Sequence, residues 1–138
     1  MKCLEIYIDG ASKGNPGLAG VGVIICQDGQ VLRNISNFIG RATNNFAEYS
    51  ALIQGLEEAL IMKADCVEIN SDSQLLCRQL NKEYKVKSQN IIGLHTQASR
   101  LISSFKKASI RFIPREENRG ADKLAAQAVK LAMKDKSI

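Results

Sequence analysis

The stretch LEIYIDGASKGNPGLAGVGVIICQDGQVLRNISNFI, residues 4–39, decides the fold of this chain. Its alternating apolar residues predict a first strand over residues 4–8, and a second apolar run covers residues 21–25. The hairpin turn signal Asp28-Gly29 precedes a third strand over residues 31–39. Because the connections are short, we expect these strands to form an antiparallel meander.

After residue 43 the apolar period changes from two to that of a helix. Thr43 or Asn44 can cap a helix over residues 49–60. The remaining pattern predicts a strand at 67–69, a helix to Leu80 capped by Ser71, Asp72 or Ser73, a helix at 91–105, a strand at 110–112 and a helix at 121–132. The later strands are reached through helices, so they should lie parallel to the first. We therefore expect an α/β fold, with a mixed five-stranded sheet (three antiparallel strands, then two parallel) and helices on both faces.

The bulk composition fits one globular domain over residues 1–138, and we expect a monomer. Apolar residues make up 45% of the chain and charged residues 24%, and no apolar run is long enough to cross a membrane. The first residues read as a strand and not as a signal peptide, so a cytoplasmic location is expected. None of the four cysteines forms a C-x-x-C pair, and free thiols in a reducing compartment are the expectation. The net charge of +5 suits a polyanionic partner.

Four acidic residues occupy distinctive places in this order of elements. Asp9 ends the first predicted strand, Asp72 follows the fourth, and Glu48 and Asp122 lie near the starts of two helices. Ligand sites in open α/β sheets form at the carboxyl ends of strands, and carboxylate oxygens suit Mg²⁺ or Mn²⁺. A pair of such ions can clamp both the attacking and the leaving oxygen of a phosphodiester. From the residues alone, the interpretation that all four are solvated surface charges or helix caps is favoured over a metal site.

Four motifs then resemble the type 1 ribonuclease H family, in family order and over nearly the whole chain. They are IDGASKGNPG at residues 8–17, TNNFAE at 43–48, NSDSQ at 70–74 and PREENRGAD at 114–122. The resemblance implies a ribonuclease H-like fold, which agrees with the derived order of elements. It is strongest to the short, archaeal-like members that lack a basic protrusion and a loop histidine.

The resemblance also implies an activity and a metal site. The chain would be an endoribonuclease that cuts the RNA strand of RNA/DNA hybrids with two Mg²⁺ ions, for which Mn²⁺ substitutes, leaving 5′-phosphate and 3′-hydroxyl ends. Asp9 would bridge both ions, Asp122 would help to hold the ion that activates water, and Glu48 and Asp72 would hold the ion near the leaving oxygen. Cleavage of double-stranded RNA stays open.

Matching positions imply substrate contacts as well. Asn15, Asn44 and Gln74 would lie along the RNA minor groove, where an amide can both donate to and accept from a 2′-hydroxyl. Thr43 would hold a DNA phosphate. Each has a structural alternative: Asn15 as a turn residue, Thr43 and Asn44 as helix caps, and Gln74 as exposed helix surface.

The chain departs from the better-known members in two places. No histidine stands between Pro114 and Asp122, so Arg115, Glu116, Glu117 or Asn118 would have to assist from that loop. The only histidine, His95, falls beside an apolar helical stripe and is expected to be structural. In place of a basic protrusion, residues 81–89 form a short segment with only three lysines, consistent with a solvated connection.

Two other functions compete with hybrid cleavage. The glycine-rich segment at residues 14–17 follows a strand, but it lacks a Gly-Lys-Ser/Thr ending, which argues against a nucleoside triphosphate site. The stronger alternative is a catalytically inactive, nucleic-acid-binding module of the same fold. The carboxylate set is complete in this chain, which favours an enzyme.

Overall fold

The computed structural model describes residues 1–136 and contains the predicted mixed sheet. Its strands lie in the order β3-β2-β1-β4-β5, with antiparallel pairing among the first three and parallel pairing of β1 with β4 and of β4 with β5. The strands are β1 (Cys3–Gly14), β2 (Gly17–Gln27), β3 (Gln30–Ala42), β4 (Cys66–Ser71) and β5 (Lys107–Phe112). The α/β class and the topology predicted from the element order are thus confirmed.

The first strand is longer than its sequence pattern indicated. We expected it to end at Asp9, but β1 runs to Gly14 and pairs with β2 through the partners Gly14 and Gly17. The expected loop is therefore only the tight turn at residues 14–17. The polar residues after Ile8 interrupt the apolar alternation, while their backbone groups still complete the hairpin ladder.

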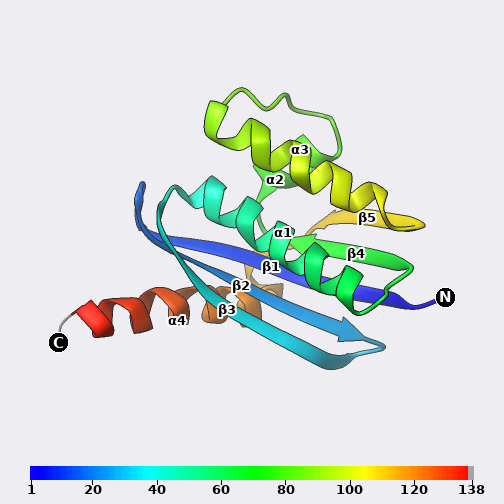
Figure 1. Ribbon diagram of the computed structural model, residues 1–138, viewed down its shortest axis with the longest axis horizontal. Helices are drawn as coiled ribbons and strands as arrows, with labels where there is room; N and C mark the ends of the chain where they lie inside the picture. The colour runs from blue at the N-terminus through cyan, green and yellow to red at the C-terminus, as the bar shows by residue number, and fades with distance from the viewer. Residues whose placement is uncertain (137–138) are drawn as a thin grey trace.

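Helices cover both faces of the sheet (Figure 1). They are α1 (Asn44–Ile61), α2 (Gln74–Leu80), α3 (Gln89–Ser103) and α4 (Arg119–Lys136). Helix α1 packs on β1 and β2, with α3 stacked against it, while α4 packs on the other face across β1, β2 and β3. No helix in the described part of the chain has the length and apolar character needed to cross a membrane.

The main core lies between the sheet and α1. Alternate residues of β1 at Leu4, Ile6 and Ile8 are fully buried, and they meet the buried face of α1 around Leu52 and Leu56. Fully burying such a side chain stabilises the fold by about 1.5–3 kcal/mol. This packing fixes α1 against β1 and so determines where its first turns lie relative to Asp9.

Two hydroxyl caps start the helices that flank the carboxylates. Thr43 Oγ1 accepts from the Phe46 amide at 3.2 Å at the start of α1, and Ser73 Oγ accepts from the Leu76 amide at 3.2 Å at the start of α2. Of the alternatives left open by the sequence, Thr43 and Ser73 are therefore the caps. Each contributes about 1 kcal/mol to its helix.

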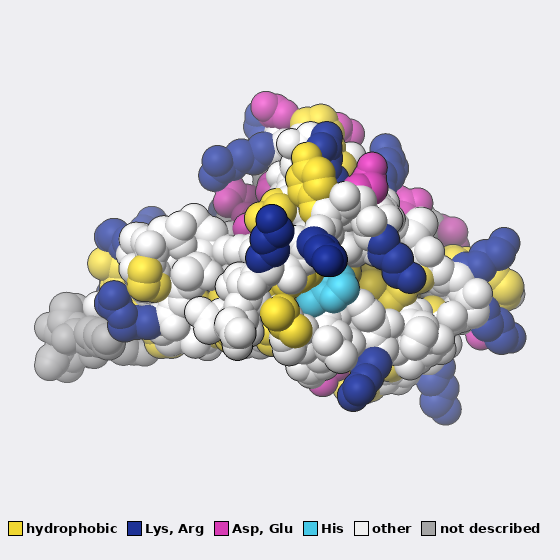
Figure 2. Space-filling view, turned by 90° about the horizontal axis from the view of Figure 1, so that it is seen from above, with side chains coloured by type: hydrophobic (Ala, Val, Ile, Leu, Met, Phe, Trp, Pro, Cys, Tyr) yellow, Lys and Arg dark blue, Asp and Glu magenta, His cyan; other side chains and the backbone are white. Residues whose placement is uncertain are grey.

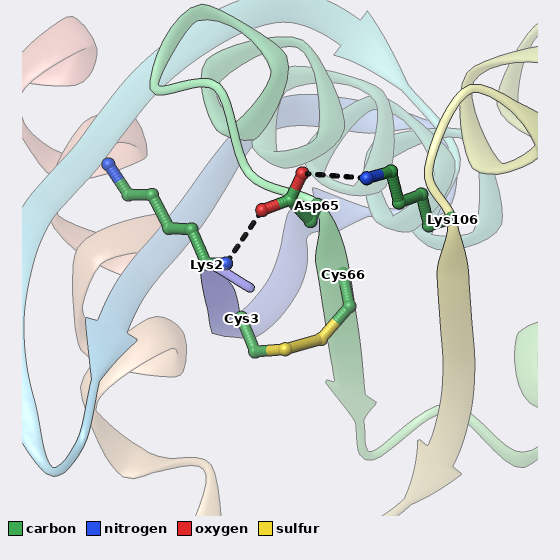
Figure 3. The surroundings of a disulfide bond; sticks show 5 residues. All are labelled: Lys2, Cys3, Asp65, Cys66 and Lys106. Atoms are coloured by element: carbon green, nitrogen blue, oxygen red, sulfur yellow. Dashed lines mark hydrogen bonds and ion pairs between the residues drawn. A yellow bond between two sulfur atoms is a disulfide. The ribbon is translucent and has the colours of Figure 1, made fainter.

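One expectation about the cysteines is wrong. Cys3 and Cys66 form a disulfide between the first residues of β1 and β4 (Figure 3), whereas Cys26 and Cys77 are free. The two residues are register partners on neighbouring strands, with their Cα atoms 4.5 Å apart. Beside the bond, the Lys2 amide donates to Asp65 Oδ2 at 2.7 Å, and Lys106 pairs with the same carboxylate at 3.8 Å. The pairing cannot be predicted from local sequence patterns because 63 positions separate the two residues.

Candidate active site

The four carboxylates identified in the sequence line one cavity of about 410 Å³. Asp9, Glu48, Asp72 and Asp122 come from β1, α1, the segment after β4, and α4. All four side chains are half-buried, so they are partly withdrawn from water yet still accessible. The fold thus brings residues from four separate sequence positions together in one acidic pocket.

Strand register places Asp9 beside Asp72. The parallel ladder between β1 and β4 ends with the partners Ile8 and Ser71, and the next residue of each strand is an aspartate. Strand β4 stops there, whereas β1 continues against β2. Asp9 therefore lies in the middle of β1, not at its end as expected. The site forms at the point where β4 ends and β1 continues with β2 as its only neighbouring strand among the described residues.

Glu48 reaches this point because α1 lies unusually close to β1. A Cβ atom on Gly10 would lie 2.4 Å from both Ala47 C and Glu48 N. Only glycine leaves room for this contact, which brings the first turns of α1 directly over the residue next to Asp9. The close approach therefore places Glu48 near Asp9.

Glycines on β2 position Asp122 in a similar way. A Cβ atom on Gly22 would lie 2.0 Å from Ala121 O, and one on Gly20 would lie 2.6 Å from Ala125 O. Gly22 is the register partner of Asp9. The first turn of α4 thus rests on the strand beside Asp9, and the Asp9 and Asp122 side chains share a hydrogen bond.

Burial and mutual repulsion raise the pKa values of two carboxyl groups in this pocket. Burial raises the pKa of Asp9 to about 8, and the Asp122 hydrogen bond and the neighbouring charges of Asp72, Asp122 and Glu48 add to the shift. Burial also raises the pKa of Glu48 to about 7, assisted by Asp72 and opposed by a hydrogen bond from Ser73. The pocket therefore resists holding all its negative charge without a compensating cation.

Asn118 organises the wall of the cavity from the loop before α4. The residue is 1% exposed, and its Nδ2 donates to Ile8 O at 2.8 Å and to Asp72 Oδ2 at 3.2 Å. Its backbone carbonyl accepts from the Asp122 amide at 3.1 Å. Asn118 thereby connects the three aspartate-bearing segments, and its contacts fit a positioning role.

Arg115 is the loop residue that reaches the pocket directly. It lines the cavity, and its guanidinium lies 3.8 Å from Asp122 Oδ1. Glu116 and Glu117 are exposed and do not line the cavity. Of the four loop candidates, Arg115 and Asn118 thus contact the carboxylates. Ser73, which the sequence indicated only as a cap candidate, is an additional residue of the site because it also bonds to Glu48.

The predicted substrate residues lie around the rim. Asn15 in the turn between β1 and β2 accepts from the Asn44 backbone amide at 3.1 Å, which links this turn to the start of α1. Asn44 lines the cavity, and Gln74 is exposed at the start of α2. Thr43 uses its hydroxyl oxygen to cap α1. The side chains of Asn44 and Gln74 thus remain accessible to a ligand.

His95 is held by packing contacts away from the carboxylates. Its Nε2 lies 3.3 Å from Gln79 O, and its ring meets Tyr49 edge-on with 6.2 Å between ring centroids. Figure 2 shows this histidine in cyan, with Lys and Arg side chains around it. These contacts agree with the structural role expected for it. The adjoining residues 81–88 form a short, non-helical connection.

The donor set fits a hard divalent cation, although its side chains are not drawn together around one. Among the side chains that the structure describes, no three from His, Cys, Asp or Glu are arranged as a ready ligand set. Asp9 and Asp122 instead share a hydrogen bond, and Asp122 pairs with Arg115. A cation that binds carboxylate oxygens would offset the crowded negative charge that, together with burial, raises the pKa of Asp9.

Comparison with known proteins places the chain in a family. The profile of the family described as reverse transcriptase-like matches residues 7–128. Ribonuclease HI of the archaeon Halobacterium salinarum is 42% identical over 127 residues, covering 91% of this chain and 64% of that protein. The crystal structure of RNase H1 from Halobacterium salinarum superposes with a TM-score of 0.91 at 40% identity, covering 93% of this chain and 98% of that one. This chain belongs to the ribonuclease HI family.

Two further relatives extend the comparison. A bifunctional protein of Mycobacterium tuberculosis is 40% identical over 129 residues, which are 92% of this chain and 35% of that protein. The chain thus spans about a third to two thirds of the length of these curated relatives. LC11-RNase H1, isolated from compost and solved in complex with an RNA/DNA hybrid, has a TM-score of 0.89 at 38% identity, covering 94% of this chain and 99% of that one.

Proposed function

We propose that this chain is an endoribonuclease that hydrolyses the RNA strand of RNA/DNA hybrids, with residues 1–138 acting as one ribonuclease H domain; residues 137–138 lie outside the described part. The observation that carries the proposal is the convergence of Asp9, Glu48, Asp72 and Asp122 on one cavity. The similar LC11-RNase H1, which was solved with an RNA/DNA hybrid, supports the proposed substrate class. Double-stranded RNA is a further candidate substrate.

The reaction would replace one phosphorus–oxygen bond with another. A water oxygen loses a proton and bonds to phosphorus, the bond to the 3′ oxygen breaks, and that oxygen takes up a proton, which leaves 5′-phosphate and 3′-hydroxyl ends. The four carboxylates would hold two Mg²⁺ ions, or Mn²⁺ in their place, and these would stabilise the charge on the attacking and leaving oxygens. This assignment matches an all-oxygen donor set that carries excess negative charge.

The other residues of the site would hold the substrate and the ligands in place. Asn44 and Gln74 offer amides that can both donate to and accept from the 2′-hydroxyls of RNA, and Asn15 supports this rim through the Asn44 backbone. Thr43 is proposed to contact a DNA phosphate. Asn118 orients Asp72, while Arg115 balances the charge of Asp122 beside the cavity.

We further propose that the chain works as a monomer in the cytoplasm. If the Cys3–Cys66 disulfide of the structure were reduced there, its two strands would stay paired. The backbone ladder between β1 and β4 pairs the same residues without help from the sulfur atoms, so the site geometry would persist.

The test compares end-labelled RNA/DNA hybrid, double-stranded RNA and double-stranded DNA, each with Mg²⁺, with Mn²⁺ and with a chelator. We expect metal-dependent cleavage of the hybrid RNA, no cleavage of the DNA duplex, and products that a 5′-phosphate-dependent exonuclease degrades. The matched variants Asp9→Asn and Glu48→Gln should be inactive. Equal cleavage of double-stranded DNA would refute the proposed substrate. Hybrid binding without cleavage would favour the alternative, an inactive nucleic-acid-binding module.

A further inference from the structure

A second hollow adjoins the catalytic cavity, on the side of α4. It has a volume of about 870 Å³ and lies between residues 11–13 of β1 and residues 123–134 of α4. We call it the α4 groove. Ala11 and Ser12 line both the catalytic cavity and the α4 groove, so the two hollows meet at this part of β1. A chain that passes through one can therefore extend into the other.

The charge of the α4 groove is of one sign. Lys123, Lys130 and Lys134 from α4 and Lys13 from β1 line it, and no acidic residue does so in the described part of the chain. Lys123 and Lys130 take part in no ion pair among the described residues. The contact found for Lys13 is with the Met133 sulfur, 3.5 Å from its Nζ. Lys123 and Lys130 thus present positive charge to the groove that no carboxylate among the described residues pairs with.

The spacing of these lysines suits an extended polyanion. Lys123, Gln127 and Lys130 follow one face of α4, because residues four and seven apart lie above one another on a helix. At a rise of 1.5 Å per residue, Lys123 and Lys130 are about 10 Å apart along the helix axis. Lys13 faces this row from the strand. The lysines therefore follow a line instead of surrounding one point.

The groove also offers apolar surface. Leu131 is 55% exposed and Met133 36% exposed, and both line it together with Val129. In a duplex the bases face each other, whereas an unpaired strand exposes base faces to such a surface. Charge and apolar area together favour an unpaired polynucleotide.

We propose that the α4 groove binds an unpaired flank of the RNA strand whose paired part occupies the catalytic cavity. This inference rests on the proposed function, since it takes the strand in the cavity to be RNA. Lysine contacts to successive phosphates hold the flank, and the apolar residues contact its bases. Hybrids with unpaired RNA beside the duplex are therefore preferred over blunt ones.

The test measures KM and kcat on blunt hybrid and on hybrids that carry a ten-nucleotide unpaired extension of the RNA 5′ end, the RNA 3′ end or the DNA strand. The variant is Lys123→Gln/Lys130→Gln. The matched control, Lys63→Gln/Lys107→Gln, removes the same charge at the other end of the sheet, near the first residues of β4 and β5. We expect an RNA extension at one end to lower KM at unchanged kcat, and a DNA extension to have no such effect.

The double variant should lose the gain from the RNA extension, whereas the control keeps it. One phosphate contact on a single strand contributes about 0.7 to the slope of log affinity against log salt concentration. Two contacts therefore make the affinity about 25-fold higher at 0.1 M salt than at 1 M. Equal KM values for blunt and extended hybrids, the same gain from a DNA extension, or equal losses in variant and control would overturn the inference.

A binding measurement separates this inference from the proposed function. Fluorescence anisotropy with labelled single-stranded RNA in a chelator reports on the α4 groove without any cleavage. Weaker binding by Lys123→Gln/Lys130→Gln, but not by the control, supports the groove even if no hybrid is cut. Normal hybrid cleavage with unchanged single-strand binding in the double variant refutes the groove alone.

Discussion

Gly22→Ala tests whether the contact between β2 and α4 positions the active site. The new Cβ atom would lie 2.0 Å from Ala121 O and 2.7 Å from Ala125 N, both backbone atoms. Ordinary contact begins near 3.4 Å, so the strand and the helix must separate by about 1.4 Å. Asp122, which follows Ala121 directly, would move away from Asp9 with the helix.

This displacement should affect both stability and activity. Overpacking of this kind costs about 1–3 kcal/mol of unfolding free energy. A misplacement of about 1 Å in a catalytic group can cost 100-fold in rate, so we expect at least that loss in hybrid cleavage. The assays are urea denaturation followed by circular dichroism, and initial cleavage rates under conditions in which the variant remains folded.

Gly93→Ala is the matched control for this experiment. Gly93 is exposed within α3, and a Cβ atom there would meet nothing within 4 Å. Because alanine restricts the unfolded chain and favours helix, this variant should gain about 0.5–1 kcal/mol with unchanged activity. A Gly22→Ala protein as stable and as active as the parent would refute the role assigned to the close contact.

Three further predictions follow from charge and chain connectivity. Asp9→Asn should abolish cleavage yet stabilise the metal-free protein, because the raised pKa of Asp9 means that its ionisation destabilises the fold. This free-energy penalty is absent below about pH 4, grows up to about pH 8 and is fully present above it, where it amounts to roughly 2–4 kcal/mol after solvent screening. Melting curves across this range check the sign, and Mg²⁺ should raise the melting temperature of the parent more than that of the variant; a variant less stable at pH 8 contradicts the reasoning. Reduction of the Cys3–Cys66 disulfide, which spans 63 positions, should lower the unfolding free energy by up to about 4 kcal/mol, while Cys3→Ser/Cys66→Ser should not respond to reductant. Affinity for blunt hybrid should fall with salt at a log–log slope of about −2 to −4, and a slope near −8 would reveal a much larger basic footprint.

Much of the fold and the membership of the carboxylate set could be predicted from sequence, because both depend on local patterns. The change from period two to helical period after residue 43 gave the order of elements, and the order gave the sheet topology. Four short motifs identified Asp9, Glu48, Asp72 and Asp122 without any distance between them. The local signals at Thr43 and Ser73 likewise placed both helix caps among their candidates.

Tertiary structure alone decided the features that depend on distances between elements. The length of β1 beyond Asp9 follows from its ladder with β2, and the Cys3–Cys66 bond follows from the register with β4. The close approach at Gly10 and Gly22 is a contact with helices that begin far away along the chain. The hydrophobic pattern of a helix or strand indicates which of its faces is buried. It does not indicate which element packs against that face, since this depends on strand register and packing across the whole fold. For this reason the sequence identified the carboxylates, whereas only the folded chain shows how glycine contacts bring them together.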